Sequence, residues 1–218
     1  MAQITDYASL TARIKTWCAR SDSTFSNEIE TFIGLSELRM QNGQGSQGEP
    51  LFCEALAVVE KEVRTTVTVT AGFATLPVDG SSTRTIRRPG DMLGLEYMTP
   101  RQFSLQDNLI TSGLPTNYTV EGNQIRITPA YTGPLELVYW KNFPAVNSSN
   151  TTNTILTVYP LLYLTGCLFE AFSWTQDIDL AAGHFARYKA IVDGINASDA
   201  STRFGGSPLR IRTRLAIP

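Results

Sequence analysis

In the first forty residues of this chain, apolar positions recur with the period of a helix. In the first segment they follow Asp6, which stands where a helix N-cap would, and they share one face: Tyr7, Leu10, Ile14 and Trp17. The same spacing resumes around Ile29, after a turn rich in capping residues. The pattern therefore predicts two helices, the second running from Glu28 to about Met40.

The middle of the chain has a period of two, which is typical of half-buried strands. The stretches "RTTVTVTAG", "FATLPVDG" and "GPLELVYWKNF" each predict a strand. In "NYTVEGNQIRITPA", two alternating runs joined through Glu121, Gly122 and Asn123 predict a β-hairpin. A short helix is expected after Pro100. Before these strands, "QNGQGSQGEP" (41–50) is interpreted as a flexible connector, and the propensities of "LFCEALAVVEKEV" (51–63) favour a short helix.

The last third of the chain returns to helical spacing. A helix is predicted from Pro160, which is tolerated in a first turn because the N–H that proline lacks would have no helical partner there. A second helix carries an apolar stripe at intervals of three and four: Ile178, Ala181, Phe185, Tyr188, Val192 and Ile195. Polar residues and the sequence "FGGSP" follow it, and the chain then ends on "LRIRTRLAIP".

This order of elements predicts an α+β fold. We expect the N- and C-terminal helices, residues 1–62 and 155–200, to pack together as a helical bundle. Residues 63–154 are then an inserted β domain, an antiparallel sheet or small sandwich. Residues 201–218 form an extended C-terminal arm.

Composition limits the classes of function. Of 218 residues, 42% are hydrophobic and 17% are charged, which is ordinary for a globular protein if a little low in charge, and the net charge is −2. Proteins that grip nucleic acid with their whole surface carry an excess of Lys and Arg, which is absent here. The longest apolar stretch is interrupted by Pro160, Gly166 and Glu170, so we expect no membrane span. No secretory signal is evident, and the three dispersed cysteines are expected to be free thiols in a reducing compartment.

Catalytic and metal-binding patterns are missing from the sequence. The one histidine, His184, lies in an amphipathic helical segment, where a surface or packing role is expected. No spacing of Cys, His and acids indicates a metal site, no phosphate-binding loop occurs, and no cofactor is implied. The acid pairs Glu60–Glu62 and Asp177–Asp179 fit helix surfaces and caps. Trp17 and Trp174 are interpreted as core residues. Trp140 lies on an alternating strand, and the pattern does not decide which face of the sheet its side chain is on.

The C-terminal arm is the one segment whose sequence pattern indicates a binding partner. Leu209 and Ile211 alternate with Arg210, Arg212 and Arg214, which is the alternation of a strand with no strand of its own domain left to pair with. Such a segment suits docking on a neighbouring protein, with the arginines meeting carboxylates. The competing interpretation is a frayed, solvated end. Phe204 is a candidate anchor, and Gly205 and Gly206 a candidate hinge.

Several stretches, in this order, resemble the phage head-to-tail adaptor proteins akin to tail tubular protein A. "DYASLTARIKTWCARSD" and "IETFIGLSELRM" are similar to that family's paired N-terminal helices. "VRTTVTVTAGFATLPVD", "LEYMTPRQF" and "GLPTNYTVEGNQIRITPA" with "LELVYW" resemble its strands. "TNTILTVYPLLYLTGCLFEAFSW" and "RYKAIVDGINASDASTRFGGSPLRIR" resemble its C-terminal helices and tail. "LFCEALAVVEKE" departs from the pattern, because it lacks the basic, proline-punctuated character of that region.

The resemblance implies a structural virion protein and not an enzyme. It implies a homo-oligomeric ring, usually of twelve copies, below the portal protein in the neck of the virion, assembled from chains made in the host cytoplasm. The ring would contact the next tail or neck protein and let DNA pass through its lumen without sequence-specific binding. In some relatives the C-terminal tail extends onto the portal, which implies that role for the arm here.

Two other functions remain open at this point. One is a carbohydrate-binding or receptor-facing tail module, for which Trp140 with Tyr118 or Tyr139 is the candidate aromatic platform. The other is a cell-wall hydrolase that uses a pair of carboxylates separated in sequence.

Overall fold

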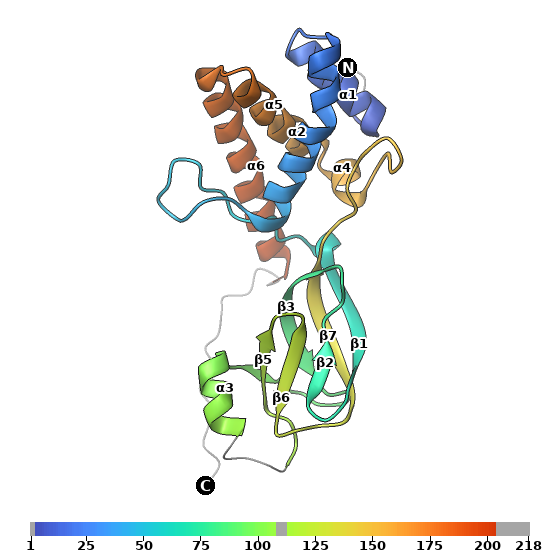
Figure 1. Ribbon diagram of the computed structural model, residues 1–218, viewed down its shortest axis with the longest axis vertical. Coiled ribbons are helices and arrows are strands. Elements are labelled where there is room, and N and C mark those ends of the chain that lie inside the picture. The colour runs from blue at the N-terminus through green and yellow to red at the C-terminus, as the bar shows by residue number, and fades with distance from the viewer. Residues whose placement is uncertain (1–2, 108–112, 204–218) are drawn as a thin grey trace. The chain divides into compact units, whose positions relative to one another are not determined.

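The computed structural model of the chain describes residues 3–107 and 113–203 (Figure 1). The chain divides into two compact units, one formed by Met1–Glu60 with Phe143–Pro218 and the other by Lys61–Asn142. The sequence predicts boundaries at 62 and 154, close to this division. Helices from both ends of the chain make up the first unit and strands dominate the second, so the predicted α+β class is confirmed.

Helices α1 (Tyr7–Trp17) and α2 (Ser23–Asn42) each begin at an aspartate cap. The carboxylate of Asp6 accepts the N–H of Ser9 at 2.8 Å, and the Ser9 hydroxyl oxygen in turn accepts the Asp6 N–H. Asp22 accepts the N–H of Phe25 at 2.9 Å. Because each cap satisfies an N–H that has no partner within the helix, α2 begins at Ser23 and not at the predicted Glu28.

Helices α4 (Thr154–Val158), α5 (Pro160–Trp174) and α6 (Ile178–Arg203) complete the helical unit. The predicted helix start at Pro160 is confirmed. A short turn joins α5 to α6, and the two lie side by side as an antiparallel pair (Figure 1). Most of the predicted stripe of α6, including Phe185 and Tyr188, is buried in the core, but Ile178 at its start is 77% exposed.

The prediction of a short helix at 51–63 is wrong. Gln44 and Cys53 exchange two backbone hydrogen bonds, at 2.8 and 2.9 Å, so the chain after α2 folds back on itself. Beyond Cys53 the partners are distant in sequence: the Leu56 N–H donates to the Met40 carbonyl of α2 at 2.8 Å, and the Ala57 and Val59 N–H groups donate to Oδ1 of Asn196 and Asp199 on α6. These partners outweigh local propensity, and only Val59–Lys61 forms a 3₁₀ turn.

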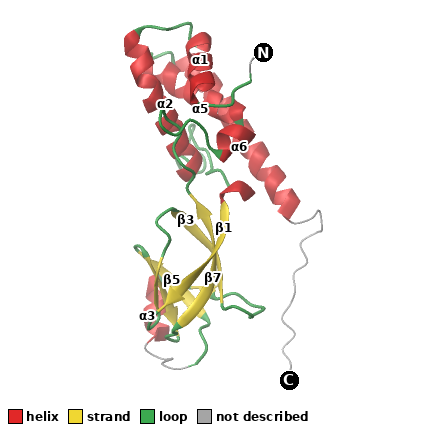
Figure 2. Cartoon of the chain, turned by 90° about the vertical axis from the view of Figure 1, so that its right-hand side faces the viewer, coloured by secondary structure: helices red, strands yellow, loops and turns green. Residues whose placement is uncertain are grey.

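The strand unit contains two sheets (Figure 2). In one, β7 (Gly133–Lys141) lies between β1 (Glu62–Val69) and β3 (Gly80–Arg87), antiparallel to both. The other has the order β2 (Phe73–Thr75), β6 (Gln124–Thr128), β5 (Asn117–Glu121), β4 (Glu96–Tyr97). The predicted hairpin is confirmed as β5–β6, whereas β4 pairs with β5 in parallel. Residues of both sheets, such as Ile86 and Ile127, share one core, as in a small sandwich.

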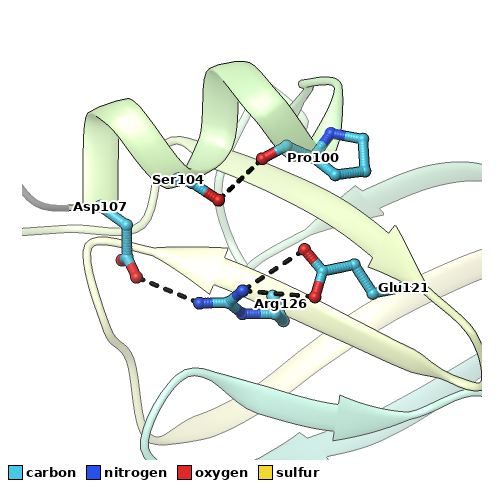
Figure 3. A network of polar contacts seen from close by, with 5 residues as sticks. All are labelled: Pro100, Ser104, Asp107, Glu121 and Arg126. Atoms are coloured by element: carbon cyan, nitrogen blue, oxygen red, sulfur yellow. Dashed lines mark hydrogen bonds and ion pairs between the residues drawn. The ribbon is translucent and has the colours of Figure 1, made fainter.

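Helix α3 (Pro100–Asp107), the short helix predicted after Pro100, is tied to the second sheet by one arginine of β6. Arg126 donates to Asp107 at the end of α3 and to Glu121 of β5, with N–O distances of 3.3 Å (Figure 3). Its guanidinium also lies 5.1 Å from the centroid of the buried Phe103 ring. Arg126 thus links a helix and two strands through charge and an aromatic ring.

Candidate functional site

The predicted docking and hinge residues lie outside the described residues. They are Phe204, Gly205, Gly206, Leu209, Arg210, Ile211, Arg212 and Arg214. The described chain ends with the last turn of α6, so the search for sites concerns the two units themselves.

A buried carboxylate organises the interior of the helical unit. Oε1 of Glu37 accepts hydrogen bonds from the Tyr163 hydroxyl at 2.8 Å and from the Val146 N–H at 2.9 Å. Asn153, the N-cap of α4, donates to the Tyr163 oxygen at 2.7 Å. Burial raises the pKa of Glu37, although these hydrogen bonds oppose the shift. Every group has a partner and Glu37 is almost inaccessible, so the arrangement is structural.

A buried ion pair lies near the C-terminal end of α2. Arg39 forms an ion pair with Glu170 of α5, and both side chains are only 11% exposed. The guanidinium also donates to Gln44 and lies 4.6 Å from the centroid of the Phe169 ring. These contacts orient the turn after α2, so the pair has a structural role.

The histidine and the cysteines pack as expected. His184 stacks on Phe172 with ring centroids 5.2 Å apart, and burial lowers its pKa, so the imidazole is neutral at pH 7. The three cysteines are free thiols. Burial raises the pKa of Cys18 and of Cys53 to about 11, and it raises the pKa of Cys167 further. All three stay protonated at neutral pH, which disfavours a nucleophilic role.

In each acid pair singled out in the sequence, one carboxylate has a structural partner. Glu62 pairs with Arg84, and Asp177 accepts the Leu180 N–H at 3.2 Å at the start of α6. Among residues 3–107 and 113–203, no group of His, Cys, Asp and Glu is arranged to hold a metal ion. Within the same residues, no helix is long and apolar enough to cross a bilayer.

A cavity of about 610 Å³ opens in the strand unit, lined by residues of both sheets. Tyr118 and Tyr139 of the proposed aromatic platform line it beside Tyr97, but both are almost buried, and Tyr139 donates to Asp79 at 3.0 Å. Trp140 is not in the lining, because neighbouring residues of a strand face opposite sides, and Arg84 lies over its ring. The predicted sugar-stacking platform is therefore not assembled.

A groove in the helical unit is formed by α1, α5 and α6. It has a volume of about 250 Å³, and its lining contains no acid: Trp17, Leu161, Leu164, Thr165, Arg187, Ala190 and Ile191. Trp17 and Leu161 are 48% and 55% exposed. The prediction that Trp17 is a core residue is wrong, as it is for Trp174, which is 40% exposed beside Phe25 and Phe32. Trp17 is instead one wall of an apolar surface groove.

The outward face of α2 forms an uncharged ridge. On the helical wheel, Asn27, Thr31, Gly34, Leu35 and Leu38 lie opposite the buried residues of this helix. Leu35 and Leu38 are 44% and 55% exposed. Sequence reasoning missed this surface because only the buried stripe was followed, although the absence of charge along the outward positions was a readable signal.

The profile of the SU10 adaptor protein family matches residues 5–212, which is nearly the whole chain. Comparison with curated proteins gives no match. The profile match does not test the closer resemblance to tail tubular protein A, which stays a prediction. The extent of the match, over both units and into the C-terminal segment, shows that the chain belongs to the SU10 adaptor protein family, a family of phage head-to-tail adaptors.

Proposed function

We propose that this phage adaptor assembles as a ring in the neck of the virion, between the portal protein and the next tail or neck protein. The ring continues the DNA channel, and twelve copies would match the portal as in similar adaptors. The observation that carries the proposal is the family match over residues 5–212. The role is structural: the protein joins one ring to the next by shape and charge.

The C-terminal arm is the portal-docking element of this proposal. The family match extends to residue 212 and so includes Leu209, Arg210, Ile211 and Arg212, while Arg214 lies just beyond it. Residues 204–218, which follow α6, hold three arginines and no acid in a chain whose net charge is −2. A basic segment of this kind would complement an acidic groove on the portal.

The charge of the chain also suits a conduit. DNA must slide through the lumen during packaging and ejection, and Lys and Arg facing it would hold the phosphates. Acids outnumber bases in this chain, 20 to 18, so it carries no excess of cations to hold the phosphates.

Deletion of residues 204–218 tests the docking role. The truncation leaves α6 through Arg203, and with it the bonds of Asn196 and Asp199 to residues 57 and 59. We expect an unchanged circular dichroism spectrum and melting temperature, but no binding to purified portal and no completion of DNA-filled heads. Normal head completion by the truncated protein would refute the docking role. Loss of folding would show instead that the segment belongs to the bundle.

A further inference from the structure

We propose that the ridge of α2 in one copy of this chain inserts into the groove between α1, α5 and α6 of the next copy, so that copies join head to tail. This inference rests on the proposed ring and assigns the surfaces that build it. A single chain cannot make the contact with itself, because ridge and groove are both exposed on the same compact unit.

The size and lining of the groove suit side chains of a partner helix. Its volume of about 250 Å³ is below the range of roughly 300–1,000 Å³ typical of small-molecule sites. Its walls are Trp17 and Leu161, and the small side chain of Ala190 leaves room on the α6 side. Leu35 and Leu38 of another copy would bury apolar surface there and cover both walls.

The charges around the ridge and the groove are also complementary. The groove is lined by the cation Arg187 and by no acid, and Arg13 lies one turn before Trp17 on the same face of α1. The ridge is flanked by Glu28 and Glu30, one on each side. Neither Arg187 nor Glu30 forms an ion pair with a described residue. Bringing the ridge to the groove places these opposite charges at one rim.

Gly34 points to the same contact. A glycine inside a helix costs roughly 1 kcal/mol relative to alanine, yet a Cβ at position 34 would meet nothing within 4 Å in the monomer. The described chain therefore gives no packing reason for the glycine. It lies between Glu30 and Leu38 along one row of the ridge, where a missing side chain lets a partner helix approach closely.

The symmetry of the contact follows from the two surfaces being different. A patch that pairs with itself gives a closed dimer, whereas a ridge that fits a separate groove leaves one of each free after every addition. Growth then ends only when the rotation between neighbours closes a ring. Ridge and groove on one unit are what such a ring requires.

Cysteine cross-linking of the full-length chain tests the contact. In a Cys18→Ser background, whose remaining Cys53 and Cys167 are buried, Leu38→Cys marks the ridge and Ala190→Cys the groove. The protein is treated with a short bis-maleimide at near-millimolar concentration. The matched control combines Leu38→Cys with Glu54→Cys, an exposed position outside both surfaces.

The ridge-and-groove pair should give a ladder of covalent dimers, trimers and larger species, well above the control. Cross-linking of a mixture of the two single-cysteine chains should stop at the dimer, because each chain carries one reactive cysteine. A ladder no stronger than the control would overturn the proposal, as would efficient homodimers of Leu38→Cys alone. A ladder from Leu209→Cys with Ala190→Cys in place of Leu38→Cys would assign the groove to the arm. Head completion is measured in parallel. Normal head completion without a cross-linked ladder would support the adaptor function and refute this interface.

Discussion

The hydroxyl of Tyr163 and the buried carboxylate of Glu37 are joined by a 2.8 Å hydrogen bond between α5 and α2. The same carboxylate oxygen accepts the N–H of Val146, in the segment that enters the helical unit after the last strand. One side chain therefore fixes two helices and the incoming chain. It does so at the cost of burying a titratable group.

Replacement of Glu37 by glutamine should change how stability depends on pH. Burial raises the pKa of Glu37 above its ordinary value, so over the window between the two values the folded chain holds a proton that the unfolded chain has released. The contribution of Glu37 to the free energy of unfolding is therefore greatest below the ordinary value and falls as pH rises through the raised one. Glu37→Gln keeps the acceptor oxygen and removes this fall. Urea titrations from pH 4 to 8 compare the two slopes, and identical slopes would contradict the assignment.

Glu37→Ala is the matched disruptive variant. It leaves the Val146 N–H and the Tyr163 hydroxyl without their acceptor, which should lower the free energy of unfolding by about 1–3 kcal/mol relative to Glu37→Gln at every pH. Equal stability of the Gln and Ala variants would show that the hydrogen bonds contribute nothing.

Gly166 should not tolerate alanine. A Cβ there would overlap Oγ of Ser36 on α2 and lie 3.3 Å from Cδ2 of Tyr188 on α6, because α5 is packed on both sides. We expect Gly166→Ala to cost about 1–3 kcal/mol in thermal or urea unfolding. Gly183→Ala on α6 is the control: a Cβ there meets nothing within 4 Å, so the change should stabilise by about 0.5–1 kcal/mol. A neutral Gly166→Ala would mean that α2 and α5 can separate freely.

Strong periodicity predicted most of the fold. The alternation in β1, the hairpin at Gly122 and the stripe through Phe185 and Tyr188 were all readable, because burial of one face determined them. Residues 51–61 could not be predicted in this way. Their conformation depends on Asn196 and Asp199, about 140 positions away, and helix propensity carries no information on such partners.

The surfaces of the helical unit were harder to predict than its core. An apolar residue at helical spacing is normally buried, and this rule predicts that Trp17 and Trp174 lie in the core. Each instead borders the surface. The groove also needs Leu161 of α5 and Ala190 of α6 beside Trp17, a juxtaposition that only the packing of α1, α5 and α6 creates.

Exchange of one charge pair should reveal the contact between copies. Arg187→Glu places an acid in the groove against Glu30 of the next copy, and Glu30→Arg places a second cation against Arg187. Each single variant should weaken self-association by about 1 kcal/mol, or roughly fivefold, in sedimentation at low salt. The double variant restores opposite charges and should recover the wild-type value, while Glu54→Arg serves as the control. If the double variant self-associates as weakly as the single variants, Arg187 and Glu30 do not meet in the contact between copies.

Charge reversal of the arm should weaken portal binding in a way that depends on salt. Arg210, Arg212 and Arg214 changed together to Glu would repel the acidic groove expected on the portal, and this repulsion is strongest when the Debye length is long. The loss in affinity, measured with purified portal, should therefore be larger at about 0.01 M than at about 1 M salt, where the Debye length falls from roughly 30 to 3 Å. Replacing the same residues by Gln separates repulsion from the loss of attraction. An equal loss at both salt concentrations would mean that Leu209 and Ile211 bind by packing alone, and the arginines would then have no electrostatic role.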